Sequence, residues 1–101
     1  METDNLRLSE STYAILLAAR DPLHGYGIML RVKQMSAGRI VIGPGTMYGA
    51  LKKLIADGWV SVESAGAQKL YTTTSVGLAA ARQEFERLNL LVKMYGGERD
   101  A

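Results

Sequence analysis

The segment GPGTMYGALKKLIADGW, residues 43–59, has the pattern of an amphipathic helix enclosed by glycine signals. Glycine and proline at its start interrupt the preceding chain, and Gly58 is typical of the position just beyond a helix C-terminus. At about 100° per residue, one stripe of the helix collects its large apolar side chains: Met47, Leu51, Leu54 and Ile55. This stripe predicts the face that packs against a core.

The opposite face of the same segment carries small residues and two lysines. Its members are Thr46, Gly49, Lys52, Lys53 and Ala56, with Tyr48 on the flank. Small side chains permit close approach to a DNA major groove, and lysines reach phosphates. Gly49 costs about 1 kcal/mol relative to alanine inside a helix, which close backbone approach to a partner would explain. The alternative is a solvated helix face without any ligand.

Composition narrows the classes of protein that the chain can form. With 101 residues, 48% of them hydrophobic and 22% charged, it fits one small globular domain. It has no cysteine, which is typical of a reducing cytoplasm and excludes thiolate metal sites. The start METDNLRLSE is acidic and polar, unlike a secretory signal, and no apolar run has the length of a membrane span. We therefore expect a cytoplasmic protein without membrane contact.

Residues for enzymatic or metal chemistry are scarce. The single histidine, His24, cannot build a metal site alone and is expected to form a hydrogen bond at a helix start. The sequence offers no nucleophile paired with a base and no phosphate-binding glycine loop. We expect no metal, no cofactor and no enzymatic activity.

Basic residues gather in the middle of the chain. Residues 31–71 hold six lysines and arginines but only Asp57 and Glu63 as acidic residues. The basic residues are Arg31, Lys33, Arg39, Lys52, Lys53 and Lys69. This distribution favours an anionic partner over the middle segment, although an unevenly charged solvated surface would give the same count.

Turn and cap signals divide the chain into a definite order of elements. We expect a helix over residues 9–21, capped by Ser9 or Ser11, and a second helix over residues 23–36, with Ile28, Val32 and Met35 on one face. A short strand at residues 40–42 (IVI) then leads into the helix of residues 43–58. Residues 59–74 form a hairpin, and Thr74 or Ser75 caps a last helix that ends near Tyr95. This order predicts a mainly α fold with a small β-hairpin, the winged helix-turn-helix. Residues 1–74 form the winged-helix unit, 75–95 a C-terminal dimerisation helix in the same compact domain, and 96–101 a flexible tail.

Three segments resemble those of a known family. They are HGYGIMLRV (24–32), GPGTMYGALKKLIADGWV (43–60) and KLYTTTSVG (69–77), and together they are similar to the PadR family of bacterial transcriptional regulators. The resemblance covers roughly residues 8–90 and implies a DNA-binding winged helix. The short last helix is similar to that of the smaller subfamily, which dimerises through it. The wing is short and carries only Gln68 and Lys69 where members of this family often have several basic residues.

The last helix has an apolar stripe at heptad spacing. Leu78, Ala81, Phe85, Leu88, Val92 and Tyr95 follow alternating steps of three and four, and Leu91 widens the stripe. We expect these residues to form the interface of a homodimer, which would set two recognition helices about 34 Å apart over a pseudo-palindromic site. The alternative is a helix that folds back on its own domain.

These observations predict a homodimeric transcriptional regulator, most simply a repressor that binds double-stranded DNA. Its expected DNA contacts are Arg39, Thr46, Tyr48, Gly49, Lys52, Lys53, Gln68 and Lys69. A small hydrophobic or aromatic effector is the expected release signal, with Trp59, Tyr13 and Tyr95 as candidates to line its pocket. A winged-helix module that binds proteins, or one that binds RNA, would share the fold and the charge pattern.

Overall fold

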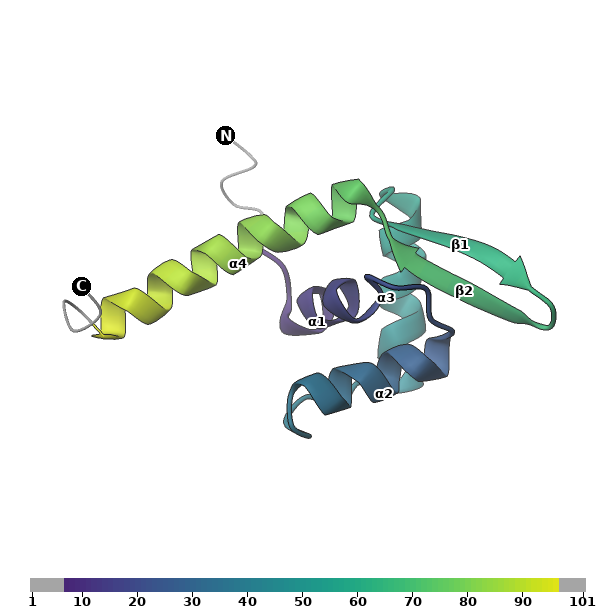
Figure 1. The fold of residues 1–101 in the computed structure, drawn as a ribbon, viewed down its shortest axis with the longest axis horizontal. Helices are drawn as coiled ribbons and strands as arrows, with labels where there is room; N and C mark the ends of the chain where they lie inside the picture. The colour runs from purple at the N-terminus through teal and green to yellow at the C-terminus, as the bar shows by residue number, and fades with distance from the viewer. Residues whose placement is uncertain (1–6, 97–101) are drawn as a thin grey trace.

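The computed structural model describes residues 7–96. Its elements, in chain order, are α1 (Glu10–Ala18), α2 (Gly25–Met35), α3 (Pro44–Ala56), β1 (Val60–Ala65), β2 (Gln68–Thr73) and α4 (Ser75–Gly96). Figure 1 shows α1, α2 and α3 gathered in the middle, with the β1–β2 hairpin projecting on one side and the C-terminal part of α4 on the other. The mainly α fold with a small hairpin is confirmed, and residues 97–101 of the expected tail lie outside the described residues.

Side-chain caps fix the helix starts that the sequence indicated. Ser9 Oγ accepts a hydrogen bond from the Thr12 amide at 3.0 Å, and His24 Nδ1 accepts one from the Gly27 amide at 3.1 Å. Thr74 Oγ1 accepts from the Gly77 amide at 3.1 Å, so Thr74 caps α4. Each bond satisfies an amide that the first helical turn leaves without a backbone partner. The expected role of His24 is thereby confirmed.

The predicted strand at residues 40–42 is wrong. Among the described residues, the sheet has two strands, β1 and β2. The Ile40 amide donates its hydrogen bond to Ser36 Oγ at 2.9 Å instead of to a neighbouring strand. Ile42 is buried and Val41 is 70% exposed, so in this connection between α2 and α3 the side chain of Ile42 packs into the core and that of Val41 faces water. The place beside β2 is occupied by Leu23, which exchanges two backbone hydrogen bonds with Tyr71.

The core lies where the first three helices meet. Its largest fully buried side chains are Ile15, Leu16, Ile28, Val32, Met47 and Leu51. The central place expected for α1 is confirmed, because its residues 14–16 are all buried. Met35 differs from expectation: it lies at the end of α2 and is 44% exposed.

The base of the hairpin and the start of α4 are joined through Trp59. The Trp59 amide donates to the Leu54 carbonyl and the Trp59 carbonyl accepts from the Thr74 amide, both at 2.9 Å. A side-chain carbon on Gly77 would collide with that same Trp59 carbonyl, so glycine permits the close contact. The hairpin is also joined to α1, since Thr73 Oγ1 donates to the Leu16 carbonyl at 2.7 Å. These bonds hold α4 at a fixed place on the body.

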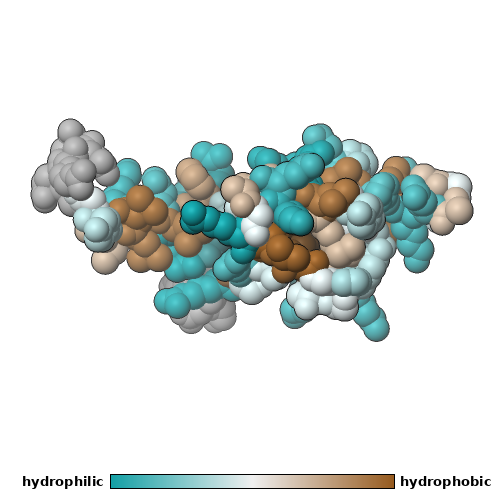
Figure 2. All heavy atoms as spheres, turned by 90° about the horizontal axis from the view of Figure 1, so that it is seen from below, coloured by the Kyte–Doolittle hydropathy of each residue, from teal (hydrophilic) through white to brown (hydrophobic). Residues whose placement is uncertain are grey.

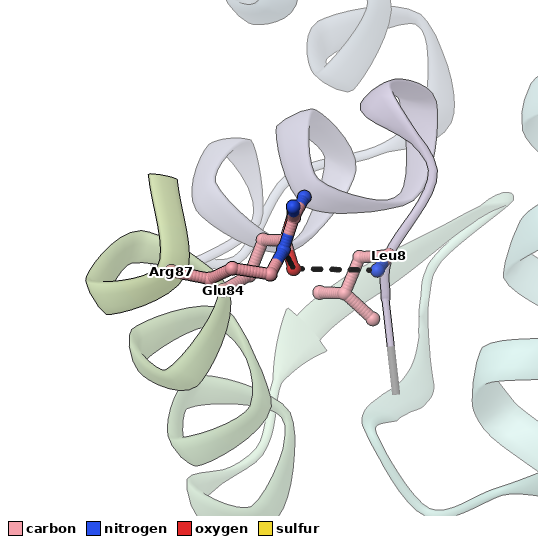
Figure 3. A network of polar contacts seen from close by, with 3 residues as sticks. All are labelled: Leu8, Glu84 and Arg87. Atoms are coloured by element: carbon pink, nitrogen blue, oxygen red, sulfur yellow. Dashed lines mark hydrogen bonds and ion pairs between the residues drawn. The ribbon is translucent and has the colours of Figure 1, made fainter. Parts of the chain in front are cut away.

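A buried carboxylate joins α4 to the N-terminal segment (Figure 3). Glu84 is 4% exposed, and its Oε1 accepts from Arg87 Nε at 3.2 Å and from the Leu8 amide at 3.4 Å. The hydrogen bond from Arg87 is the main cause that lowers the pKa of Glu84; burial opposes it, and the Leu8 amide, with the charges of Arg87 and Arg7, lowers it further. Glu84 is therefore a charged group satisfied inside the fold.

Because of this carboxylate, the free energy of unfolding should depend on pH in the acidic range. Because the pKa of Glu84 is lower in the folded chain, its contribution is present above the pKa of an unfolded glutamate, about 4.3, and is lost as the pH falls through the folded value. We expect Glu84→Gln to reduce the free energy of unfolding by about 2 kcal/mol at neutral pH, with the difference from wild type shrinking as the pH falls below about 4. Urea unfolding at several pH values would measure this difference.

A neighbouring acid provides the control. Glu86 pairs with Arg82 at 3.5 Å, and its side chain is 65% exposed. Glu86→Gln should change the free energy of unfolding by less than about 0.5 kcal/mol at every pH. Equal effects of the two substitutions would contradict the structural role of Glu84.

Candidate nucleic-acid interface

The outward face of α3 is exposed as its sequence pattern predicted. Thr46, Gly49, Lys52, Lys53 and Ala56 are all exposed, whereas Met47, Leu51 and Leu54 are buried in the core. Lys53 Nζ lies 4.0 Å from an Asp57 carboxylate oxygen, with both side chains open to water. Such a pair is weak, so Lys53 remains available to a phosphate.

The start of α3 packs closely against the start of α2. The Tyr48 ring lies on Gly25, where a side-chain carbon would collide with the Tyr48 hydroxyl. Pro44 occupies the first turn of α3, and Gly43, its cap residue, offers no side-chain acceptor to the amides there. The N-terminal end of α3, with its partial positive charge, thus lies at the surface beside Tyr48.

A hollow of about 420 Å³ separates these helix starts from the hairpin. Tyr48 of α3 and Gln68 and Lys69 of β2 all line it, so the structure brings these three predicted DNA contacts together. Burial raises the pKa of Tyr71, which also lines the hollow, and the phenol stays neutral there. Arg39 is exposed in the turn between α2 and α3 and does not line the hollow.

Tyr26 is a surface residue that the sequence reasoning missed. It lines the same hollow from the first turn of α2, and it is 62% exposed. A large aromatic residue between two glycines, Gly25 and Gly27, was the signal that could have indicated it. Its hydroxyl adds a hydrogen-bonding group to the hollow.

The apolar stripe of α4 divides into a buried and an exposed part. The side toward the body holds Gly77, Ala80, Ala81 and Glu84. Ala81 is 3% exposed in the single chain, so its inclusion in a dimer interface needs correction: it has almost no surface left for a partner. Leu88 is half-buried.

The remaining stripe residues are exposed. Leu78, Phe85, Leu91 and Val92 are between 41% and 66% exposed, and Tyr95 is 94% exposed. Figure 2 shows hydrophobic side chains gathered at the end of the molecule where α4 projects. Leu90 and Met94 are also exposed, but at about 100° per residue they lie on the side of α4 opposite the heptad stripe. The C-terminal half of α4 therefore leaves a large apolar area uncovered within one chain.

The three aromatic residues expected to share an effector pocket lie apart. Tyr13 lines a groove of about 610 Å³ between α1 and α4, together with Phe85. Trp59 lines a different hollow beside α3, and Tyr95 lines neither of them. A single pocket between the first and last helices is therefore wrong.

Among residues 7–96, no cluster of three or more His, Asp or Glu side chains could hold a metal ion. In the same range, no helix is long and apolar enough to cross a membrane.

The order of elements, the hairpin wing and the exposed third helix define a winged-helix DNA-binding protein. A family model described as the transcriptional regulator PadR-like family matches residues 15–83. The chain belongs to this family, whose members are transcriptional regulators and not enzymes.

Relatives agree with this assignment. A transcriptional regulator from Clostridium thermocellum superposes with a TM-score of 0.73 at 21% identity, covering 88% of this chain and 91% of that one. A PadR family transcriptional regulator from Eggerthella lenta superposes with a TM-score of 0.70 at 26% identity, covering 84% of this chain and 77% of that one. Bacillus subtilis PadR in complex with operator DNA superposes with a TM-score of 0.60 at 28% identity, covering 71% of this chain and 45% of that one.

A curated relative is much longer than this chain. An uncharacterized 37.1 kDa protein in transposon TN4556 of Streptomyces fradiae is 36% identical over 81 residues. The match covers 78% of this chain but only 23% of that protein.

Proposed function

We propose that the protein is a homodimeric repressor that binds a pseudo-palindromic DNA operator in the cytoplasm and is released by a small apolar effector. The observation that supports DNA binding is the exposed face of α3, with Lys52 and Lys53, beside a hollow that the wing closes with Gln68 and Lys69. Small residues along this face leave room for base edges, and the lysines supply charge for the backbone.

The exposed stripe of α4 supports the dimer. Phe85, Leu91 and Val92 form an apolar surface that a monomer would leave in water. A second copy offers the same surface, and isologous pairing of one patch with itself is the commonest way to cover it. Two α3 helices related by that symmetry match two half-sites of one operator.

Selection of bound duplexes from a random DNA pool would test the proposal. We expect enrichment of a sequence with inverted half-sites, and affinity for it that falls steeply as salt rises. If no duplex is enriched and the chain instead binds a protein tightly at all salt concentrations, the result would support a protein-interaction module. Preference for RNA over duplex DNA in competition would support the RNA-binding alternative.

Gly49 gives a test of how closely α3 approaches DNA. A side-chain carbon at Gly49 meets no atom within 4 Å, so Gly49→Ala should stabilise the free protein by about 1 kcal/mol through its higher helix propensity. In the proposed complex the added methyl faces the groove, and we expect several-fold weaker operator binding. Thermal unfolding and operator titration of the same variant would measure both effects.

The two measurements control each other. A more stable variant with weaker DNA binding locates the loss at the interface and not in folding. Operator affinity equal to that of wild type would show that the α3 backbone does not approach DNA at Gly49.

A further inference from the structure

The hollow between the starts of α2 and α3 and the hairpin is lined by hydrogen-bond donors. Tyr26 and Tyr48 bring two hydroxyls to it, and Gln68 and Lys69 bring an amide and an ammonium group. Each of these side chains can donate a hydrogen bond. Among residues 7–96, Lys69 is the only charged residue that lines the hollow, and no carboxylate does. This space of about 420 Å³ therefore suits an anion.

His24 adds another donor to the hollow. It lines the hollow from the cap position of α2, and its Nδ1 accepts a hydrogen bond from the Gly27 amide at 3.1 Å. A ring nitrogen that accepts a hydrogen bond carries no proton, so the proton of the imidazole is on Nε2. The cap of α2 thus fixes the ring in the form whose other nitrogen donates.

The register of the hairpin directs Lys69 toward the hollow. Lys69 and Tyr71 are two residues apart on β2, so their side chains lie on the same face of the hairpin, and both line the hollow. Glu63 is paired with Leu70, so its side chain lies on the other face. The acidic residue of the hairpin is therefore kept away from an anion in the hollow.

Backbone contacts hold the groups of the hollow together. The Tyr48 hydroxyl lies so close to Gly25 that a side-chain carbon there would collide with it. Tyr26 follows Gly25 in the first turn of α2, and the backbone bonds between Leu23 and Tyr71 join the chain just before that turn to β2. The starts of α2 and α3 and the wing thus meet at one junction, with donors from all three.

The hollow is open to water, which favours an anion that belongs to a longer chain. Tyr26 is 62% exposed and Tyr48 is 48% exposed. Water screens such groups, so a small free anion would gain little there. A sugar–phosphate backbone separates the major groove of DNA from the minor groove, so it would pass between α3 in one groove and the wing in the other. The hollow lies between these two elements (Figure 1).

We propose that this hollow holds one phosphodiester group of the DNA backbone in each half-site, bound by the hydroxyls of Tyr26 and Tyr48 together with Lys69. Tyr26 is then a DNA contact supplied by α2, with the Nε2 donor of His24 on the same hollow. A phosphate shared by α2, α3 and the wing fixes the position of α3 along the groove, because backbone contacts set the register of a protein on the duplex. The proposal rests on the proposed function, since it requires α3 to dock on DNA.

Tyr26→Phe tests the new contact, because it removes one exposed hydroxyl and keeps the ring. We expect operator binding to weaken about fivefold for the lost hydrogen bond. A hydroxyl releases no counterion, so the slope of affinity against salt should stay that of wild type, whereas Lys69→Ala should reduce it. The loss should be equal for strong and weak operators, since a phosphate carries no base sequence. Anisotropy titrations at several salt concentrations would measure these effects.

Gln34→Ala is the matched control. Gln34 is also an exposed polar residue of α2, but it does not line the hollow. Its substitution should leave operator affinity and the salt slope unchanged. An equal loss in Gln34→Ala and Tyr26→Phe would overturn the contact.

Neutral substitutions in the DNA would locate the phosphate. A methylphosphonate replaces one charged phosphate oxygen with a methyl group, and a set of operator duplexes would carry it at one position at a time. We expect one position in each half-site where the methylphosphonate weakens wild-type binding several-fold and Tyr26→Phe binding much less, as a direct contact requires. Gln34→Ala should respond like wild type at every position. An operator that is bound without such coupling at any position would overturn the site.

Inorganic phosphate separates the site from the proposed function. It should shift the amide resonances of Tyr26 and Lys69 in the ¹⁵N-labelled chain more than chloride does at equal ionic strength, with half-saturation on the order of 10 mM or above. The same shifts in a chain that binds no duplex would contradict the proposed function and support the hollow as a phosphate site. Half-saturation below about 1 mM would identify a free phosphate compound as the ligand and overturn the assignment to the DNA backbone.

Discussion

Replacing Phe85 with alanine is expected to dissociate the protein into monomers. Phe85 is 53% exposed in the single chain, so the cost within one subunit stays below the 3–5 kcal/mol of a fully buried ring. If the exposed part is covered by a second copy, its loss removes a central aromatic anchor worth about 2–4 kcal/mol. The dimer dissociation constant should then rise by at least about 30-fold. Sedimentation over a range of concentrations would measure it.

The same substitution should weaken operator binding. A monomer has one recognition helix and loses the linkage between two half-sites, so binding to an inverted repeat should fall far more than binding to a single half-site. Higher protein concentration should restore the dimer and, with it, the affinity.

Val76→Ala is the matched control for Phe85. Val76 also lies on α4 and is 56% exposed, but it is not part of the heptad stripe. It should leave the association state unchanged. A wild-type protein that remains monomeric at concentrations on the order of 10 µM would contradict both the dimer and the two-half-site arrangement.

Removing both lysines from α3 is the second large expected effect. Lys52 and Lys53 are exposed and lie off the buried stripe, so Lys52→Ala with Lys53→Ala should fold normally. Operator affinity should fall by about 2 kcal/mol, or about 30-fold, and the salt slope should decrease by about one to two charges. Lys69→Ala should cost about 1 kcal/mol or less, because it removes one phosphate contact on a short wing.

Two exposed lysines outside α3 and the wing provide the control for net charge. Lys33→Ala on α2 with Lys93→Ala on α4 removes the same charge. We expect only a small change in operator affinity. An equal loss in the two double variants would show that overall charge, and not the face of α3, governs binding.

Local signals predicted the elements that depend on local contacts. The glycine-proline break before α3, the Ser9 and Thr74 caps and the turn after β1 are all set by residues within a few positions of one another. The apolar stripe of α3 was likewise readable, because helical periodicity alone separates Met47 and Leu51 from Lys52.

Features that depend on distant partners were not readable from the sequence. The segment 40–42 has β-branched residues, but a strand needs an open neighbouring edge, and Leu23 occupies the place beside β2. In α4, heptad spacing could not show that Ala81 turns toward the body, since this depends on how α1 lies beside it. Tyr26 had a local signal, its place between two glycines, but only the structure shows that it lies beside the wing residues Gln68 and Lys69.

The firm attachment of α4 makes it a lever arm. The 22 residues of α4 give a rod of about 33 Å, and its first half is fixed to the body from Gly77 to Glu84. A rotation of the body by about 5° would therefore displace the far end of the rod by about 3 Å, roughly the spacing of one base pair. If a partner holds the far end, the displacement appears instead at α3 and the wing. A small change in the angle between two copies would thereby become a mismatch with the helical repeat of DNA.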